Sequence, residues 1–371
     1  MVTAPRYPEL GFYTLPGHVG SAKDCQEEVR QGDALGLGSV WISERLNTKE
    51  VGVLSGIAAA TSPNIGIATG LISNLTLRNP VTVAALGSTM SKLTDGRFAL
   101  GMGRGVDPLA DATGTTRLNF RVMEDYVTIL RRLWRGETVD YEGPVGKLSG
   151  LKLGGPVESP PPVISAAMGD KTCRWAGRVC DGVLFNSLWT PEATAHSVKI
   201  VRQGAEEAGR DPASVRIWAV QVTACDVPEE LFLKYVVRRM NTYLLFPPMM
   251  ESLCTMNGWS RADLTRLQAA LAEFDNGNVT EGGLMGDEAT TRSLDDLRRM
   301  AALYPQDWIQ RGNAVGSAED VAKATKERFD AGVDGVLFHG TDPRYLESFV
   351  RAWPRHRDDA RFAGRSVNPG L

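Results

Sequence analysis

Three segments of the chain repeat one local pattern, in which a helix ends at a glycine and leads into a short apolar strand. They are residues 33–44 (DALGLGSVWISE), 175–187 (WAGRVCDGVLFNS) and 328–340 (RFDAGVDGVLFHG). A helix that stops at glycine before a continuous apolar strand is typical of the step from a helix to a parallel strand. Because the pattern recurs at the start, middle and end of the chain, we expect βα units along its whole length.

The other strands can be placed between these three. We expect strands at 38–43, 182–186 and 335–339, and further strands at 10–15, 65–72, 97–102, 162–167 and 215–224. Helices fall between them, and apolar residues at a 3.6-residue period within 123–134 indicate one of these. Eight strand–helix units predict an α/β fold, a (β/α)8 TIM barrel, in one domain over residues 1–371.

Two insertions interrupt this barrel pattern. Residues 137–162 are rich in Gly and Pro and are predicted to form a hairpin and loop. Residues 228–316 are long and mostly helical and lie between the seventh and eighth strands. Within them, the apolar and aromatic stretch 238–259 is interpreted in two ways, as packing alone or as a lid over the barrel mouth.

Composition excludes several classes of protein. The net charge is −3, from 41 basic and 44 acidic residues, so a basic nucleic-acid-binding face is not expected. No apolar run is long enough to span a membrane, and no signal peptide is recognisable, so we expect a cytoplasmic protein. The five cysteines form no CxxC pair and the four histidines form no HxH or HExxH motif, so we expect reduced thiols and no metal.

Two polar groups follow predicted strands at the functional end of such a barrel. Glu44 and Arg45 end the second strand, where a carboxylate beside a guanidinium could orient a hydroxyl, act as a base, or form only an ion pair at the rim. Gly70 interrupts the third strand, which indicates a bulge, a close ligand approach or an ordinary loop. Asn74 and Arg78 supply polar groups just beyond it.

Two further loops carry features of phosphate binding. Gly101, Gly103 and Gly105 follow the fourth strand, but their spacing and the absence of an acidic residue after the next strand argue against a dinucleotide fold. The fifth strand ends in SAAMGDKT, where a helix begins near Asp170 and its backbone N–H groups could bind phosphate. Lys171 adds a positive charge there, while Asp170 also suits the role of helix cap.

Residues 75–105 (LTLRNPVTVAALGSTMSKLTDGRFALGMGRG) resemble the luciferase-like monooxygenase superfamily. Its members carry R-x-P, an apolar helix and then L-S/T-x-G-R-F-x-L-G-x-G-x-G. The resemblance continues in GLGSVWISER, PPVISAAMGDKTCRWAGRVCDGVLFNS, YLLFPPMMESLCTMNGW and AGVDGVLFHG, and so spans essentially the whole chain. Within the superfamily the chain looks like the actinobacterial branch assigned to coenzyme F420.

This resemblance implies a flavin or deazaflavin lying across the barrel mouth. Its ring would lie near Gly70, Leu71, Ser73 and Asn74, with a non-prolyl cis peptide at Gly70–Leu71. Its phosphate and ribityl end would face Gly103, Arg104, Gly105, Ala166, Ala167, Met168, Gly169, Asp170 and Lys171. For the substrate pocket we expect Tyr13, Asn186, Trp189, Tyr243 and His339.

The chain departs from its relatives at the end of the second strand. Many deazaflavin-dependent relatives carry an Asp/Glu-His pair there, whose His takes part in proton transfer, whereas this chain has Glu44-Arg45. Arginine stays protonated and cannot be the base. Glu44, or His18 in the loop after the first strand, could serve instead, and Arg45 would stabilise an anionic ring or an alkoxide.

The resemblance therefore predicts an F420-dependent oxidoreductase that moves a hydride between the deazaflavin and a small or lipid-like organic substrate, such as an alcohol, a carbonyl or an activated alkene. One alternative is an FMN-dependent monooxygenase supplied by a separate reductase. Another is a cofactor-binding protein without turnover. A homodimer is common in the superfamily.

Overall fold

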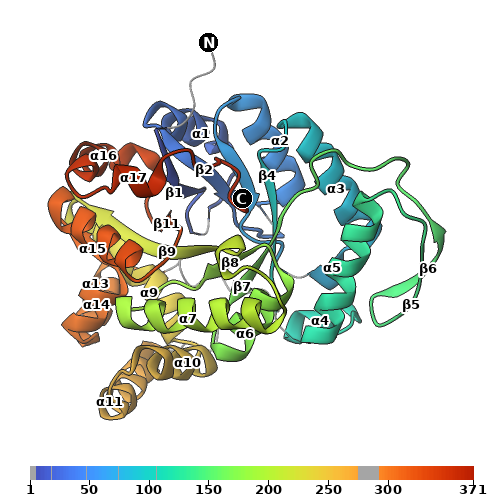
Figure 1. Ribbon diagram of the computed structural model, residues 1–371. Helices are drawn as coiled ribbons and strands as arrows, with labels where there is room; N and C mark the ends of the chain where they lie inside the picture. The colour runs from blue at the N-terminus through green and yellow to red at the C-terminus, as the bar shows by residue number, and fades with distance from the viewer. Residues whose placement is uncertain (1–5, 18, 47, 74, 106, 275–291) are drawn as a thin grey trace.

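Eight parallel strands close into a barrel in the part of the chain that the structure describes, as the sequence predicts (Figure 1). This computed structural model describes residues 6–371 except 18, 47, 74, 106 and 275–291. Each barrel strand pairs with the next, and β11 pairs with both β9 and β1, which closes the ring. The barrel strands are β1 (Tyr7–Thr14), β2 (Leu37–Ile42), β3 (Gly66–Thr69), β4 (Phe98–Met102), β7 (Val163–Ala167), β8 (Gly182–Phe185), β9 (Arg216–Cys225) and β11 (Gly335–His339).

The third strand is shorter than the predicted 65–72. Strand β3 ends at Thr69, and the peptide bond between the two residues that follow, Gly70 and Leu71, is cis. The chain then returns to the sheet at Ile72, which forms a single parallel bridge with Met102. The interruption at Gly70 places this loop beside the end of β4.

Helices cover the outside of the barrel (Figure 1). Thr190 caps the helix that begins at Pro191, and Asn79 caps the helix that begins at Pro80, each through its side chain. The apolar stripe expected within 123–134 is buried on one face of α5. The helices that follow barrel strands are α1 (Cys25–Ala34), α2 (Val51–Thr61), α3 (Pro80–Leu93), α4 (Asp107–Thr113), α5 (Phe120–Trp134), α6 (Asp170–Val179), α7 (Pro191–Glu207), α15 (Ala318–Asp330) and α16 (Glu347–Ala352).

The apolar core is divided by the sheet into two parts. Most buried side chains lie between the sheet and the helices. A second cluster fills the barrel interior, where Trp41 of β2 and Trp218 of β9 meet edge to face with ring centroids 5.2 Å apart. Ala68 and Ala99 lie in the same interior cluster, and their small side chains leave room for the two indoles. The barrel is therefore packed below its mouth rather than hollow.

Both predicted insertions are present. Residues 137–162 contain an antiparallel hairpin of β5 (Val139–Gly143) and β6 (Gly146–Leu151). The long insertion between β9 and β11 is mostly helical but also contributes a short strand, β10, which pairs with β9 and which the sequence pattern did not predict. Its elements are α8 (Glu229–Phe232), the π-helical turn η3 (Leu233–Val237), α9 (Arg238–Leu244), α10 (Pro247–Asn257), α11 (Arg261–Leu271), η4 (Ala272–Phe274), α13 (Leu294–Leu303), α14 (Gln306–Gly312) and β10 (Ala314–Gly316).

The last residues of the chain lie against the bottom of the barrel, at the amino ends of the strands (Figure 1). Asn368 donates its side-chain amide to the carbonyls of Gly96 (2.6 Å) and Phe98 (3.1 Å). The indole of Trp218 donates to the carbonyl of Pro369 at 2.7 Å. This C-terminal tail closes one end of the barrel. The remaining short helices are η1 (Leu75–Leu77), η2 (Pro212–Ser214), η5 (Pro343–Tyr345), η6 (Trp353–Arg355) and α17 (Asp359–Phe362).

The helices in the described ranges are each too short or too polar to cross a lipid bilayer. All five cysteines are buried free thiols. The described residues also contain no group of three or more His, Cys, Asp or Glu side chains arranged to hold a metal ion.

Candidate active site

A cavity of about 490 Å³ opens at the carboxyl ends of the barrel strands. That volume lies within the usual range for small-molecule sites. Residues from β1, β7 and β11, the loops after β2, β3, β4 and β8, and helices α5, α9 and α10 all contribute to it. Its lining residues are Tyr13, Ser43, Glu44, Arg45, Gly70, Leu71, Ser73, Gly103, Arg104, Gly105, Phe120, Met123, Ala166, Ala167, Met168, Thr172, Leu184, Phe185, Asn186, Val220, Arg239, Tyr243, Met249 and His339.

One wall of this cavity consists of small residues from the loops after β3 and β4 and from the end of β7. Gly70, Gly103 and Gly105 line it together with Ala166 and Ala167. A Cβ atom on Gly103 would meet its nearest neighbours at 3.4 Å, which is ordinary contact distance, so backbone packing does not force glycine at this position. Gly105 has a φ of +77°, a conformation that favours glycine. The wall therefore lets a ligand approach the backbone closely.

The carboxylate of Glu44 is fully engaged by neighbouring donors. Its side chain is 2% exposed and accepts hydrogen bonds from Arg78 at 2.6 Å and from the backbone N–H and hydroxyl of Ser73 at 3.0 and 3.2 Å. Arg78 also pairs with Glu50. These contacts tie the end of β2 to the loop after β3 and balance the charge of Glu44. Whether Glu44 also acts as a base stays a prediction.

Arg45 and Arg239 bring positive charge into the cavity from two different elements. Arg45 donates to the carbonyl of Glu44 at 2.7 Å, and burial, then the nearby Arg239, lower its pKa. The guanidinium of Arg239, on α9, lies 4.6 Å from the ring centroid of Tyr243 and donates to its hydroxyl. The stretch 238–259 therefore contributes side chains to the mouth of the barrel, which favours the lid interpretation over packing alone.

The floor of the cavity is aromatic. The rings of Tyr13 and His339 meet edge to face with centroids 4.7 Å apart, and both side chains are buried. Burial raises the pKa of Tyr13, so its hydroxyl remains a hydrogen-bond donor even at alkaline pH. Asn186 lies across from them beside Met168. Tyr13, Asn186, Tyr243 and His339 thus line one cavity, and their role in substrate binding stays a prediction.

Some predicted site residues do not line this cavity. The side chain of Trp189 packs on Phe185 with ring centroids 4.7 Å apart, because it belongs to the core beneath the rim. Helix α6 begins just after Gly169, and its first residue, Asp170, turns toward α7 and contacts His196 at 3.0 Å. Lys171 lines a neighbouring hollow instead. His18 and Asn74 lie outside the described residues.

The neighbouring hollow adjoins the cavity at the start of α5. Phe120 lines both spaces, so they are adjacent at this residue. The hollow carries four cationic and two acidic side chains, and its volume is about 570 Å³. Its lining residues are Phe120, Arg121, Glu124, Asp125, Thr128, Lys171, Arg174, Trp175 and Arg178.

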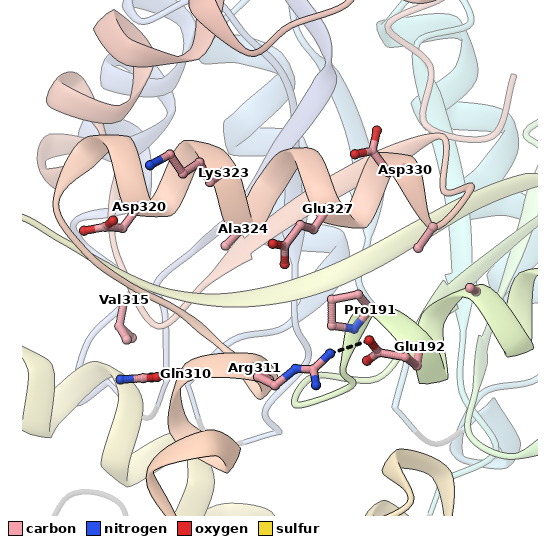
Figure 2. A pocket seen from close by; sticks show the side chains of 12 residues that line it. Pro191, Glu192, Gln310, Arg311, Val315, Asp320, Lys323, Ala324, Glu327 and Asp330 are labelled. Carbon is pink, nitrogen blue, oxygen red and sulfur yellow. Dashed lines mark hydrogen bonds and ion pairs between the residues drawn. The ribbon is translucent and has the colours of Figure 1, made fainter.

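A larger hollow lies on the outer helical layer (Figure 2). It is bounded by α15, by α14 and by the start of α7, and the ion pair between Arg311 and Glu192 crosses it. Its volume is about 980 Å³, but half of its lining side chains are charged, and it lies in the helical layer away from the carboxyl ends of the barrel strands. Size alone therefore does not mark the functional site of this barrel.

The sequence matches the model of the family described as luciferase-like monooxygenase over residues 9–335. The chain belongs to this family. It is 25% identical over 346 residues to the F420-dependent glucose-6-phosphate dehydrogenase of Amycolatopsis mediterranei, a match that covers 88% of this chain and 92% of that protein. It is 30% identical over 195 residues to the 5,10-methylenetetrahydromethanopterin reductase of Methanolobus tindarius, of whose length the match covers 58%, or a little over half.

Solved structures show the same luciferase-like barrel. The coenzyme F420-dependent tetrahydromethanopterin reductase of Methanopyrus kandleri superposes with a TM-score of 0.74 at 18% identity, covering 94% of this chain and 99% of that one. The oxygenating component of 3,6-diketocamphane monooxygenase of Pseudomonas putida, in complex with FMN, superposes with a TM-score of 0.61 at 18% identity, covering 98% of each chain. These likenesses establish the fold. The chain is an oxidoreductase of the luciferase-like class.

Within this luciferase-like site, sequence reasoning missed several lining residues. Phe120 and Met123 lie at the start of α5, where Met123 was assigned only to a buried stripe. Arg239 and Met249 lie in the segment expected to cover the mouth, but no periodicity singles them out. Their positions depend on how the insertion packs on the barrel, which a single sequence does not encode locally.

Proposed function

We propose that this protein is an F420-dependent oxidoreductase that transfers a hydride between the deazaflavin and an organic substrate, an alcohol, a carbonyl or an activated alkene. Two observations support the cofactor. The curated relatives named above include an F420-dependent dehydrogenase that matches over nearly the whole chain. The cavity offers a wall of Gly and Ala residues, along which a flat ring system and its phosphate can approach the backbone.

The residues of the cavity suit the two ends of such a cofactor. Gly70 and Leu71 would lie against the ring, and Gly103, Gly105 and Ala166 would face the ribityl and phosphate end. When bound, a deazaflavin supplies a two-electron hydride donor or acceptor at carbon 5. The protein's own part is to orient both reactants, to exclude water beneath α9 and α10, and to balance charge through Arg45, which cannot accept a proton.

One observation favours F420 over FMN. FMN ends at its phosphate, whereas F420 continues into an anionic lactyl-glutamate tail. The hollow that adjoins the cavity at Phe120 carries Arg121, Lys171, Arg174 and Arg178 against Glu124 and Asp125, a net positive lining. Such a lining would attract the anionic tail of F420, and it would add no binding energy for FMN, which ends at its phosphate.

The test is a fluorescence titration of the purified protein with F420 and with FMN at low and high salt. We expect F420 to bind with micromolar or tighter affinity, more tightly than FMN, and with a steeper loss of affinity as salt increases, since exposed charge contacts are screened. Lys171→Met and Arg178→Met should weaken F420 binding and leave FMN binding unchanged. Arg351→Met, a charge change on α16, is the matched control.

Several outcomes would contradict the proposal. Equal affinity for both cofactors at low salt, or protein purified with stoichiometric FMN, would favour the FMN-dependent monooxygenase. Oxygen consumption with reduced FMN would then identify that activity. Tight F420 binding with no turnover across a panel of alcohols, carbonyls and alkenes would instead favour a cofactor-binding protein.

A further inference from the structure

Three cationic side chains gather at one end of the cavity without a carboxylate partner. In the described ranges, Arg45, Arg239 and Lys49 form no ion pair with Asp or Glu, whereas most other arginines of the chain do. The one carboxylate that lines this cavity, Glu44, is already paired with Arg78. Buried charges are costly unless an opposite charge balances them. This end of the cavity therefore carries uncompensated positive charge.

The two arginines keep donors available for a ligand. Each guanidinium has five N–H donors. Arg45 uses one on the carbonyl of Glu44, and Arg239 uses one on the hydroxyl of Tyr243. The Nε atoms of both are buried and have no hydrogen-bond acceptor. Both side chains line the cavity, so an anionic oxygen group there would meet donors that nothing else satisfies.

Lys49 lies directly behind this pair. Its side chain is fully buried, and its ammonium donates to the carbonyls of Leu15 (3.0 Å) and Gly17 (2.6 Å) and to the hydroxyl of Ser43 (3.2 Å). All three acceptors are neutral. Burial, followed by Arg45 and Arg239, lowers its pKa to about 7. Ser43 lines the cavity, so one hydroxyl group separates Lys49 from any ligand there.

The position of this cluster separates it from the expected phosphate end of the cofactor. In the closed strand order, β4, which precedes Gly103, and β7, which carries Ala166, lie opposite β11 and β1, which carry His339 and Tyr13. Arg45 follows β2 and Arg239 enters from α9, on the Tyr13 side of the ring. An anion bound by these arginines would therefore belong to the second reactant.

We propose that Arg45 and Arg239 form an anion subsite that binds a carboxylate or phosphate group on the substrate, with Lys49 behind them. Leu184, Val220 and Met249 line the same cavity and suit an apolar body attached to that group. The substrate class is thus a small organic acid or phosphate ester that carries the group to be oxidised or reduced. The identity of the ligand as a substrate rests on the proposed function, whereas the anion subsite itself does not.

Anion binding should be coupled to proton uptake. A nearby negative charge stabilises the ammonium form and raises the pKa of Lys49, so around neutral pH an arriving anion draws a proton onto it. Affinity should fall as the pH rises from 6.5 to 8.5. The charged groups that face Lys49 are Arg45, Arg239 and Glu28 of α1, whose own pKa is raised by burial. Glu28→Gln separates the contribution of that carboxyl from that of Lys49.

The experiment is isothermal titration calorimetry with sodium butyrate and with sodium sulfate at constant ionic strength. Neither probe titrates in this pH range. The titration is run on the apo-protein and on the F420-loaded protein. Buffers of different ionisation enthalpy are used so that the number of protons taken up can be measured. We expect saturable binding, a loss of at least tenfold in Arg239→Met, and net proton uptake that Lys49→Met removes. Arg238→Met, the adjacent arginine on α9 that does not line this cavity, is the matched control.

The F420 affinity of each variant, measured separately by fluorescence, decides the origin of the anion. If the F420 affinity of Arg239→Met stays within twofold of the wild-type value, the subsite belongs to the substrate. If it weakens F420 to the same extent, or if bound F420 abolishes butyrate and sulfate binding, the arginines serve the cofactor and the proposal is wrong. An absence of saturable binding also overturns it.

Butyrate binding without any F420 binding would sustain the subsite and refute the proposed cofactor. If Lys49→Met does not fold, the pH series on the wild type decides, since constant or rising affinity would contradict a role for Lys49.

Discussion

Glu44 and Arg45 are adjacent in sequence but have opposite surroundings. Glu44 is held by Arg78 and Ser73, whereas Arg45 lines the cavity with donors to spare. The two side chains are therefore placed for different roles. The carboxylate fixes the loops after β2 and β3, and the guanidinium carries charge toward the ligands.

Substitution of Glu44 tests whether its carboxylate also takes part in chemistry. If it orients or deprotonates the substrate, Glu44→Gln should lower kcat by roughly a hundredfold, the low end for general acid–base catalysis. F420 affinity should change much less. Steady-state kinetics with reduced F420 would measure the first and fluorescence titration the second. His18→Ala tests the rival base. Unchanged turnover in Glu44→Gln would leave the residue a purely structural ion-pair partner.

Gly101, near the end of β4, and Gly103, just after it, should respond differently to the same change to alanine. A Cβ atom on Gly101 would lie 2.0 Å from the carbonyl oxygen of Thr69, so Gly101→Ala forces the backbones of β4 and β3 apart. We expect it to lower the free energy of unfolding by about 1–3 kcal/mol, as overpacking does. Gly103→Ala meets only ordinary contacts and should preserve stability but weaken cofactor binding. Urea unfolding and cofactor titration of both variants provide the comparison, which fails if the two lose stability equally.

At the scale of elements, the insertion between β9 and β11 supplies what the barrel strands alone cannot. Helix α9 places Arg239 and Tyr243 at the mouth, and α10 places Met249 there. Asn257, at the end of α10, accepts from the backbone N–H of Thr190 at 2.9 Å and donates to the carbonyl of Leu188 at 2.8 Å. One side chain thus fastens the covering helix to the loop after β8.

Asn257→Ala should loosen this cover without unfolding the barrel. Both hydrogen bonds are lost, and each contributes roughly 0.5–1.5 kcal/mol. We expect faster amide hydrogen exchange in residues 238–257, a severalfold rise in KM and a smaller change in kcat. Exchange measured by mass spectrometry should be unchanged in the barrel strands. An equal increase in exchange throughout the molecule would show that Asn257 stabilises the whole fold instead.

The sequence predicts the repeated elements well because each unit carries its own local signals. Helix-ending glycines and apolar runs place β2, β8 and β11 within a residue or two of their observed bounds. Strand β10 was missed because its three residues have no pattern beyond their pairing with β9. In the site, Gly103 and Ala166 could be predicted from their loops. Arg239 and Phe120 could not, because their place depends on packing between distant segments.

At the scale of the whole molecule, the C-terminal tail contacts the amino ends of the barrel strands. Asn368 donates hydrogen bonds to the carbonyls of Gly96 and Phe98 at that end of the barrel. Asn368→Ala should lower the free energy of unfolding by roughly 1–3 kcal/mol, since the buried hydrogen bond to Phe98 and the partly buried one to Gly96 are both lost. Chemical denaturation measures this loss. F420 affinity should stay unchanged, and a parallel loss of binding would mean that the tail also shapes the mouth.

Because the C-terminal tail lies against the amino ends of the strands, ligands should enter and leave the cavity through its opening at the carboxyl ends. A molecule bound beside Tyr13 and His339 should therefore be hindered from leaving while a second molecule lies along the wall of small residues in the same cavity. We therefore expect an ordered kinetic mechanism, in which the reactant that binds first is released last. Product-inhibition kinetics would reveal this as a compulsory order, with one product competitive toward only one reactant. Random-order patterns would mean that the helices over the mouth open far enough for two molecules to pass each other.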